Sequence, residues 1–237
     1  MSSSVTLVIR TFGPEEIYSI INKIKSQTSH QFVCTELIIV NGDPLRPLSE
    51  VLAREWSGGM VELFIPQDFF SYGRSLNIGV ERATNEIVLL LSGHSVPVDE
   101  NWLESMLIPF ADHRVAAVCG AQIPRRTSNG LERAYRTIWY SIPVVARIIG
   151  VFNATNASIR KSVWMGHQFD EKLMSCEDRE WACRVKHNGW NVEFSRSGAV
   201  IHSHDIGYIA SIEYFRVLTT NTILAWIACI RNGFSNK

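Results

Sequence analysis

The 237-residue sequence lacks an excess of basic residues, because its 23 lysines and arginines are balanced by 23 aspartates and glutamates. A dedicated nucleic-acid-binding protein usually carries surplus positive charge, so we expect no nucleic acid partner. The five cysteines are scattered and contain no C-x-x-C pair, which argues against a disulfide framework and against a zinc ribbon. A local positive site for a small anionic ligand is compatible with this balance.

A leader sequence and long apolar runs are also missing. The chain opens Met-Ser-Ser-Ser and enters an apolar strand directly, so we expect no signal peptide. The apolar stretch 142–152 is broken by Arg147, and the stretch 223–230 is too short to span a bilayer. These features predict a cytoplasmic protein, and the apolar segment 209–230 leaves open a peripheral contact at the inner face of the membrane.

Several short motifs of other enzyme classes are absent. The sequence contains no G-x-G-x-x-G, no G-x-x-x-x-G-K, no G-x-S-x-G and no H-E-x-x-H. Dinucleotide dehydrogenases, P-loop NTPases, α/β-hydrolases and zinc proteases of that type are therefore disfavoured. With 46% apolar residues and 10% aromatic residues, the chain is an ordinary globular protein with a sizeable core.

The first 120 residues or so alternate strand and helix patterns. Apolar runs of strand length occur at 5–9, 36–40, 61–65, 86–91 and 115–119, and helical patterns follow at 14–24, 73–83 and 99–110. Apolar strands separated by helices imply a parallel sheet that is covered on both faces. Ligands of such sheets bind at the carboxyl ends of the strands, which here are polar.

The second half has a less regular pattern. We expect a helix over 131–149, a strand over 157–160, a helix over 177–188 that stops at Gly189, short strands over 191–194 and 199–201, and an apolar helix over 209–230. The whole pattern predicts an α/β protein.

Taken in order, these segments resemble family 2 glycosyltransferases, which are inverting nucleotide-sugar enzymes with the GT-A fold. The resemblance rests on VTLVIRTFG, ELIIVNGDP, FSYGRSLNIGVERATNEIVLLLSGHSVPVDENWLE, NATNASIRKSVW, FDEKL, CEDREWACRVKHNGW and SGAVIHSHD. It spans about residues 5–205 and is strongest toward rhamnosyltransferase-type sequences. It implies a mostly parallel central sheet with helices on both faces, a nucleotide-sugar-binding half at 1–125 and an acceptor-binding half at 126–237, within one continuous domain.

The implied function is transfer of a sugar, with inversion, from a nucleotide-diphospho-sugar to a hydroxyl of a growing surface polysaccharide or lipid-linked glycan. A catalytically silent module that binds nucleotide or partners is the alternative. A nucleotidyltransferase fits less well, because the segment 10–13 is a poor phosphate-binding loop.

The resemblance assigns catalysis to Asp178, as the general base, and to Glu177, as its neighbour in the acidic motif. A sugar hydroxyl that attacks C1 must lose its proton, and a carboxylate within hydrogen-bond reach can accept it. Acidic residues at a helix start are also common capping elements, so the pattern alone does not decide.

Nucleotide-sugar binding is assigned to Thr11, Asn41, Asp43, Arg74 and Asn77. Strand-end polar groups face the nucleotide in this family, and arginine can grip a diphosphate through charge-assisted hydrogen bonds. A turn or a surface arginine explains the same residues without a ligand.

The family normally has an Asp-x-Asp motif that holds Mg²⁺ or Mn²⁺, and Ser92-Gly93-His94 stands in its place here. The same three residues are assigned to the nucleotide-sugar site. His94, His202 and His204 are candidate ligands for a divalent cation, although imidazoles prefer transition metals and also hydrogen-bond phosphates. Trp181, three residues past Asp178, is a candidate for acceptor contact, with a place in the core as the alternative.

Overall fold

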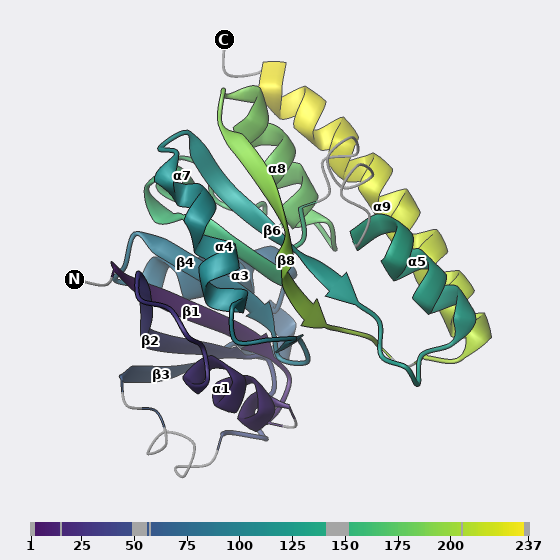
Figure 1. The fold of residues 1–237 in the computed structure, drawn as a ribbon. Helices are drawn as coiled ribbons and strands as arrows, with labels where there is room; N and C mark the ends of the chain where they lie inside the picture. The colour runs from purple at the N-terminus through teal and green to yellow at the C-terminus, as the bar shows by residue number, and fades with distance from the viewer. Residues whose placement is uncertain are drawn as a thin grey trace.

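The computed structural model describes residues 3–14, 16–48, 56, 58–140, 152–204 and 206–234. Its centre is a sheet of eight strands (Figure 1). The strands are β1 (Ser3–Thr11), β2 (Phe32–Asn41), β3 (Gly59–Phe64), β4 (Ile87–Ser92), β5 (Val96–Pro97), β6 (Val115–Ile123), β7 (Asn156–Arg160) and β8 (Asn191–Ile201). They lie in the order β3-β2-β1-β4-β7-β6-β8-β5.

Most neighbouring strands run parallel, which confirms the predicted fold class. β1 pairs in parallel with β2 and β4, β2 with β3, and β6 with β8. β7 runs antiparallel between β4 and β6, and the short β5 runs antiparallel to β8. The strand order reverses at β1, which places a crevice at the carboxyl ends of β1 and β4.

Helices cover both faces of the sheet. They are α1 (Ile17–Lys25), α3 (Tyr72–Arg82), α4 (Trp102–Leu107), α5 (Gly130–Tyr140), α7 (Lys161–Gly166), α8 (Glu177–His187) and α9 (Tyr208–Phe234). α1 and α4 pack on one face, and α3, α7 and α8 pack on the other. Successive residues of β1 point to opposite faces, so Leu7 joins the first core and Val8 joins the second.

Two helices illustrate why the sequence folds this way. In α1, four isoleucines recur at helical spacing and are all buried, namely Ile17, Ile20, Ile21 and Ile24. α3 is capped by Ser71, whose hydroxyl accepts a hydrogen bond from the backbone N–H of Arg74. A Cβ atom on Gly79 would lie 2.4 Å from Cγ1 of Val8, so the glycine lets α3 approach β1 closely.

The structure differs from the predicted elements at several places. The helix expected over 99–110 is α4 followed by a 3-10 turn at Ile108–Ala111, because Pro109 lacks the N–H that would continue the helix. The two strands expected after Gly189 form one strand, β8, which has register shifts against β6. β5 and α7 were not predicted, and the part of the expected helix 131–149 beyond residue 140 lies outside the described residues. Cys183 is disulfide-bonded, whereas Cys34, Cys119 and Cys176 are free thiols.

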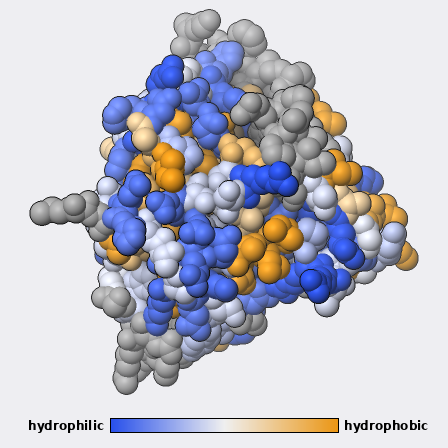
Figure 2. Space-filling model, in the orientation of Figure 1, coloured by the Kyte–Doolittle hydropathy of each residue, from blue (hydrophilic) through white to orange (hydrophobic). Residues whose placement is uncertain are grey.

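α5 and α9 lie side by side at one edge of the molecule and extend beyond the sheet (Figure 1). In the same orientation, Figure 2 shows hydrophobic residues along this edge and a mostly hydrophilic surface over the sheet. None of the described helices combines the length and the apolar character needed to cross a bilayer.

Candidate active site

A cavity of about 720 Å³ lies at the carboxyl ends of β1, β4 and β6. Its wall includes Arg10 and Thr11 from β1, Ser92 from β4, Gln122 from β6 and Asp178 from α8. Side chains of α5 and α9 complete the wall on the opposite side. Both halves of the sequence therefore contribute to one site, at the position that the strand order predicts.

The acidic pair stands at the start of α8, in the cavity wall. Cys176, the residue before it, has a φ of 64° and is the one non-glycine residue with positive φ in the described part of the chain. Such a left-handed residue is uncommon and is found mainly where the surroundings hold it in place. Here it turns the chain so that Glu177 and Asp178 open the helix, and both are buried, at 4% and 8% exposed.

The two carboxyl groups have different surroundings. Asp178 accepts hydrogen bonds from the backbone N–H groups of Ala154, at 3.0 Å, and Arg179, at 2.8 Å. The Glu177 carboxylate has an ion-pair contact with Arg10, at a longer N–O distance of 3.9 Å. Hydrogen bonds from N–H groups stabilise the charged form, so the environment favours ionisation of Asp178 over Glu177.

Burial raises the pKa of both acids. The pKa of Glu177 rises to about 8, first because burial disfavours its charge and second because of the charge of Asp178. Burial also raises the pKa of Asp178, and the charge of Arg179 together with the two N–H donors opposes that rise. At neutral pH Glu177 is therefore mostly protonated, and Asp178 is the member of the pair whose carboxylate form the backbone N–H donors stabilise.

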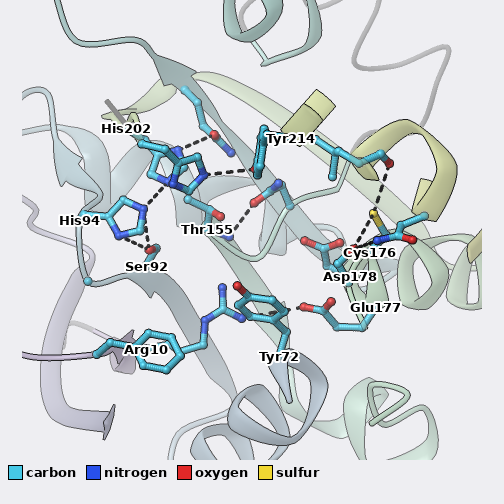
Figure 3. Close-up of a pocket in the computed structure, with 18 of the residues that line it drawn as sticks. Arg10, Tyr72, Ser92, His94, Thr155, Cys176, Glu177, Asp178, His202 and Tyr214 are labelled. Atoms are coloured by element: carbon cyan, nitrogen blue, oxygen red, sulfur yellow. Dashed lines mark hydrogen bonds and ion pairs between the residues drawn. The ribbon is translucent and has the colours of Figure 1, made fainter. Parts of the chain in front are cut away.

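His94 and His202 lie on the other side of the cavity from Asp178 (Figure 3), and His204 belongs to the same group of histidines. Each offers a ring nitrogen, and these atoms all lie within 4.8 Å of one another. Burial, the other histidines and nearby arginines lower the pKa of His94 to about 3 and that of His202 well below its usual value. The structure thus brings together the three predicted candidates, and two of them, His94 and His202, are in the neutral form in which imidazoles bind metals.

Four arginines also line the cavity, namely Arg10, Arg46, Arg136 and Arg179. Arg10 lies over the ring of Tyr72, with its Cζ atom 4.6 Å from the ring centroid. The sequence analysis assigned none of these four arginines to the site. Only Arg10 could have been found from the sequence, because it stands at the polar end of the first strand.

Eight of the predicted site residues line the cavity. They are Thr11, Ser92, Gly93, His94, Glu177, Asp178, His202 and His204. The remaining five do not, namely Asn41, Asp43, Arg74, Asn77 and Trp181.

Three of the predicted nucleotide-binding residues, at the end of β2, in the turn after it and in α3, have protein partners instead. The buried amide of Asn41 donates to Glu62 Oε1 at 2.9 Å and to the backbone oxygen of Arg46 at 3.0 Å. Asp43 pairs with Arg46 at 2.6 Å. Arg74 is half-exposed, and its Nε atom lies 3.5 Å from Oε2 of Glu171. These contacts favour structural roles for the three residues.

Asn77 and Trp181 lie in the core. The Asn77 side chain donates to the backbone oxygen of Phe169 and to Glu171, and accepts from the Trp164 indole and the Phe169 N–H. Trp181 is fully buried, and its ring centroid lies 5.3 Å from that of Phe169. The spacing of three residues between Asp178 and Trp181 did not predict this position of Trp181. Residues three apart share a helix face only roughly, and Trp181 turns toward the sheet.

The chain matches the family model described as Glycosyl transferase family 2 over residues 8–186. It therefore belongs to this family of glycosyltransferases, as its sequence pattern predicts.

Two relatives act on bacterial O-antigen chains according to their names. The O-antigen chain rhamnosyltransferase RfbN of Salmonella typhimurium is 25% identical over 247 residues, which cover 97% of this chain and 75% of the relative. The O-antigen chain rhamnosyltransferase WbaN of Salmonella anatum is 28% identical over 177 residues, which cover 70% of this chain and 56% of the relative. The similarity to rhamnosyltransferase-type sequences is thereby confirmed.

Solved structures with the same fold include other glycosyltransferases. The mannosyltransferase PcManGT from Pyrobaculum calidifontis, in complex with GDP-Man and Mn²⁺, has a TM-score of 0.71 at 15% identity, over 98% of this chain and 65% of that one. S. aureus TarS 1–349 in complex with UDP-GlcNAc has a TM-score of 0.62 at 15% identity, over 87% of this chain and 60% of that one. At these identities the likeness establishes the GT-A fold alone.

Proposed function

We propose that this protein is an inverting glycosyltransferase that moves a sugar from a nucleotide-diphospho-sugar to a hydroxyl group of a growing surface polysaccharide. The names of the two rhamnosyltransferase relatives support a rhamnosyl donor and an acceptor of the O-antigen type. The observation that carries the proposal is Asp178, a buried carboxylate in the cavity wall whose charged form accepts two backbone N–H bonds.

The cavity suits a single displacement. The donor lies at the strand ends of the half 1–125, against Thr11, Ser92, Gly93 and His94. The acceptor enters from the half 126–237, between α8 and α9. Its hydroxyl attacks C1 of the donor sugar from the face opposite the diphosphate, and Asp178 accepts the hydroxyl proton as the bond to the diphosphate breaks.

Glu177 has a positioning role in this scheme. Because it is protonated at neutral pH, it does not compete with Asp178 as the base, and its O–H group can donate a hydrogen bond to the acceptor. Cys176 fixes the direction in which both side chains leave the helix.

The exposed side of α9 supports a peripheral contact with a membrane, where a lipid-linked acceptor would lie. Ile209 is 85% exposed, and Ile212, Ile223 and Leu224 are each more than half exposed. Isolated exposed apolar residues are normal, but several on one helix form an apolar strip. This strip lies at the edge of the molecule that α5 and α9 form (Figure 2).

The test is the variant Asp178→Asn, assayed with a nucleotide-diphospho-rhamnose donor and an O-antigen intermediate as acceptor. The amide keeps the shape and cannot accept the proton, so transfer should fall by about 10²–10⁴-fold while donor binding persists. Asp112→Asn, which changes an aspartate outside the cavity, is the matched control. If Asp178→Asn keeps wild-type turnover, the catalytic assignment is wrong, and donor binding without any transfer in the wild type would favour a silent binding module.

A further inference from the structure

Four side chains form a hydrogen-bonded chain from α5 to the end of β4. Nη1 of Arg136 lies 2.6 Å from Nδ1 of His202, and Nε2 of His202 lies 2.8 Å from Nε2 of His94. Nδ1 of His94 lies 3.0 Å from Oγ of Ser92. Figure 3 shows His94 between Ser92 and His202, and the two imidazole rings are stacked with their centroids 4.6 Å apart.

The arginine sets the direction of this chain, because a guanidinium group donates hydrogen bonds and cannot accept them. Nδ1 of His202 has two neighbours: Nη1 of Arg136, which can only donate, at 2.6 Å, and Oε1 of Gln122, which can only accept, at 3.1 Å. Oε1 of Gln122 already accepts from Nη1 of Arg136, and the contact of Nδ1 with Arg136 is the shorter one, so we assign Nδ1 as the acceptor and place the ring proton of His202 on Nε2. That proton is donated to Nε2 of His94. His94 then carries its own proton on Nδ1 and donates it to Ser92.

A metal ion at the three histidines would need a different arrangement. An imidazole that binds a metal gives one nitrogen lone pair to the ion and usually donates its other N–H to an acceptor. On His202 that second nitrogen faces Arg136, a donor. Arg136 is only 3% exposed and is held by Oε1 of Glu132 at 2.9 Å, so this contact keeps the guanidinium group beside His202. Nε2 of His202 is consequently a donor and not a metal ligand.

The chemistry of the cluster also differs from that of a magnesium or manganese site. Within the described residues, the group that could hold an ion consists of three imidazoles and includes no carboxylate. Mg²⁺ and Mn²⁺ prefer oxygen ligands, and the Asp-x-Asp carboxylates are replaced by Ser92 and His94. The residues present do not fit the cation that the GT-A family implies.

Positive charge is available from the neighbouring strand. Arg10 pairs in register with Ser92, so its side chain leaves the sheet beside the end of β4. Its Nη1 atom is buried and makes no hydrogen bond to the described residues, and the oxygen of Glu177 in ion-pair contact with it is 3.9 Å away. Buried donors without an acceptor are uncommon, and phosphate oxygens match the planar fork of a guanidinium.

We propose, on the basis of the function proposed above, that Arg10 binds the donor's diphosphate in place of a divalent metal ion. The chain that begins at Arg136 assists it, because Ser92 accepts from His94 and so keeps its own O–H free to donate to a phosphate oxygen. The charge that develops on the leaving diphosphate is then offset by fixed donors in the cavity wall.

The first test uses inorganic pyrophosphate as the probe, measured by calorimetry in buffer that contains EDTA. The wild type should bind it without metal, and Arg10→Met should weaken binding by about 10- to 100-fold, the range for lost hydrogen bonds to a charged group. Arg114→Met removes the same charge from an arginine outside the cavity and should leave the affinity unchanged. Failure of the wild type to bind pyrophosphate in EDTA would overturn the proposal, whether or not Mn²⁺ restores binding.

The second test needs no nucleotide and no activity. Mn²⁺ titrated into the wild type and followed by electron paramagnetic resonance should give no stoichiometric bound ion. One bound Mn²⁺ per chain that disappears in His202→Ala would overturn the proposal. A transferase that requires Mn²⁺ would leave the Asp178→Asn result standing, so the two proposals fail separately.

Discussion

Removing the carboxyl group of Glu177 should change how the stability of the protein depends on pH. In the folded protein the pKa of this group is about 8, and its ordinary value is 4.5. Between these two values the unfolded chain loses the proton and the folded protein keeps it. The stabilisation that this group contributes is therefore fully present below about pH 4.5 and is lost as the pH rises toward 8.

The size of the effect follows from the two pKa values. One pKa unit corresponds to about 1.4 kcal/mol, so between pH 5 and pH 8 this one group should lower the free energy of unfolding by about 3 kcal/mol. Glu177→Gln has no proton to lose and should not show this decline. The pKa of Asp178 is also raised, and the two carboxyl groups interact, so the difference between the two proteins reports the titration of the pair.

The measurement is urea unfolding of both proteins, followed by circular dichroism at pH 5, 6, 7 and 8. The informative quantity is how the difference in free energy of unfolding between the two proteins changes with pH. A difference that is the same at every pH only reports how well the amide fits the site. Glu81→Gln, at an exposed position of α3, is the control and should follow the wild type at each pH. Parallel curves for Glu177→Gln and the wild type would refute the buried, protonated state of Glu177.

Two further predictions concern residues outside the acidic pair. Asn77→Ala should lower the free energy of unfolding by about 3 kcal/mol in urea denaturation, because it leaves the Trp164 and Phe169 N–H groups buried without an acceptor, and it should leave the pyrophosphate affinity of the folded protein unchanged. Ile209→Glu combined with Ile223→Glu should reduce co-sedimentation with phospholipid vesicles by tenfold or more, whereas Val33→Glu, at an exposed apolar residue on β2, should not.

The central strands could be predicted from the sequence because they are buried on both faces. Runs such as 36–40 and 86–91 are apolar without alternation, and that pattern has few explanations other than a covered parallel sheet. β5 could not be predicted in this way, since two residues carry no periodicity and their pairing depends on β8, which lies about a hundred residues further along the chain.

The site residues at strand ends could be predicted from the sequence, and those that helices contribute could not. Thr11 and Ser92 end adjacent strands, so the fold class alone brings them together. Arg136 and Tyr214 reach the cavity from α5 and α9, whose placement depends on packing between helices that no local pattern encodes. Their side chains are ordinary for exposed helices, and nothing in the sequence distinguishes them.

Asn77 shows why a polar residue in a family motif can be mistaken for a residue that binds a ligand. Its four hydrogen bonds hold residues 169–171 against α3, and a Cβ atom on Gly73 would lie 2.5 Å from the backbone oxygen of Asp170. The same segment leads directly into Cys176 and the acidic pair. The stretch FSYGRSLN therefore affects the site indirectly. Its contacts hold the segment that carries the acidic pair against the half of the protein proposed to bind the donor. A buried asparagine that holds a loop in place and one that binds a substrate look the same in the sequence. Only the positions of their hydrogen-bond partners in the structure distinguish the two roles.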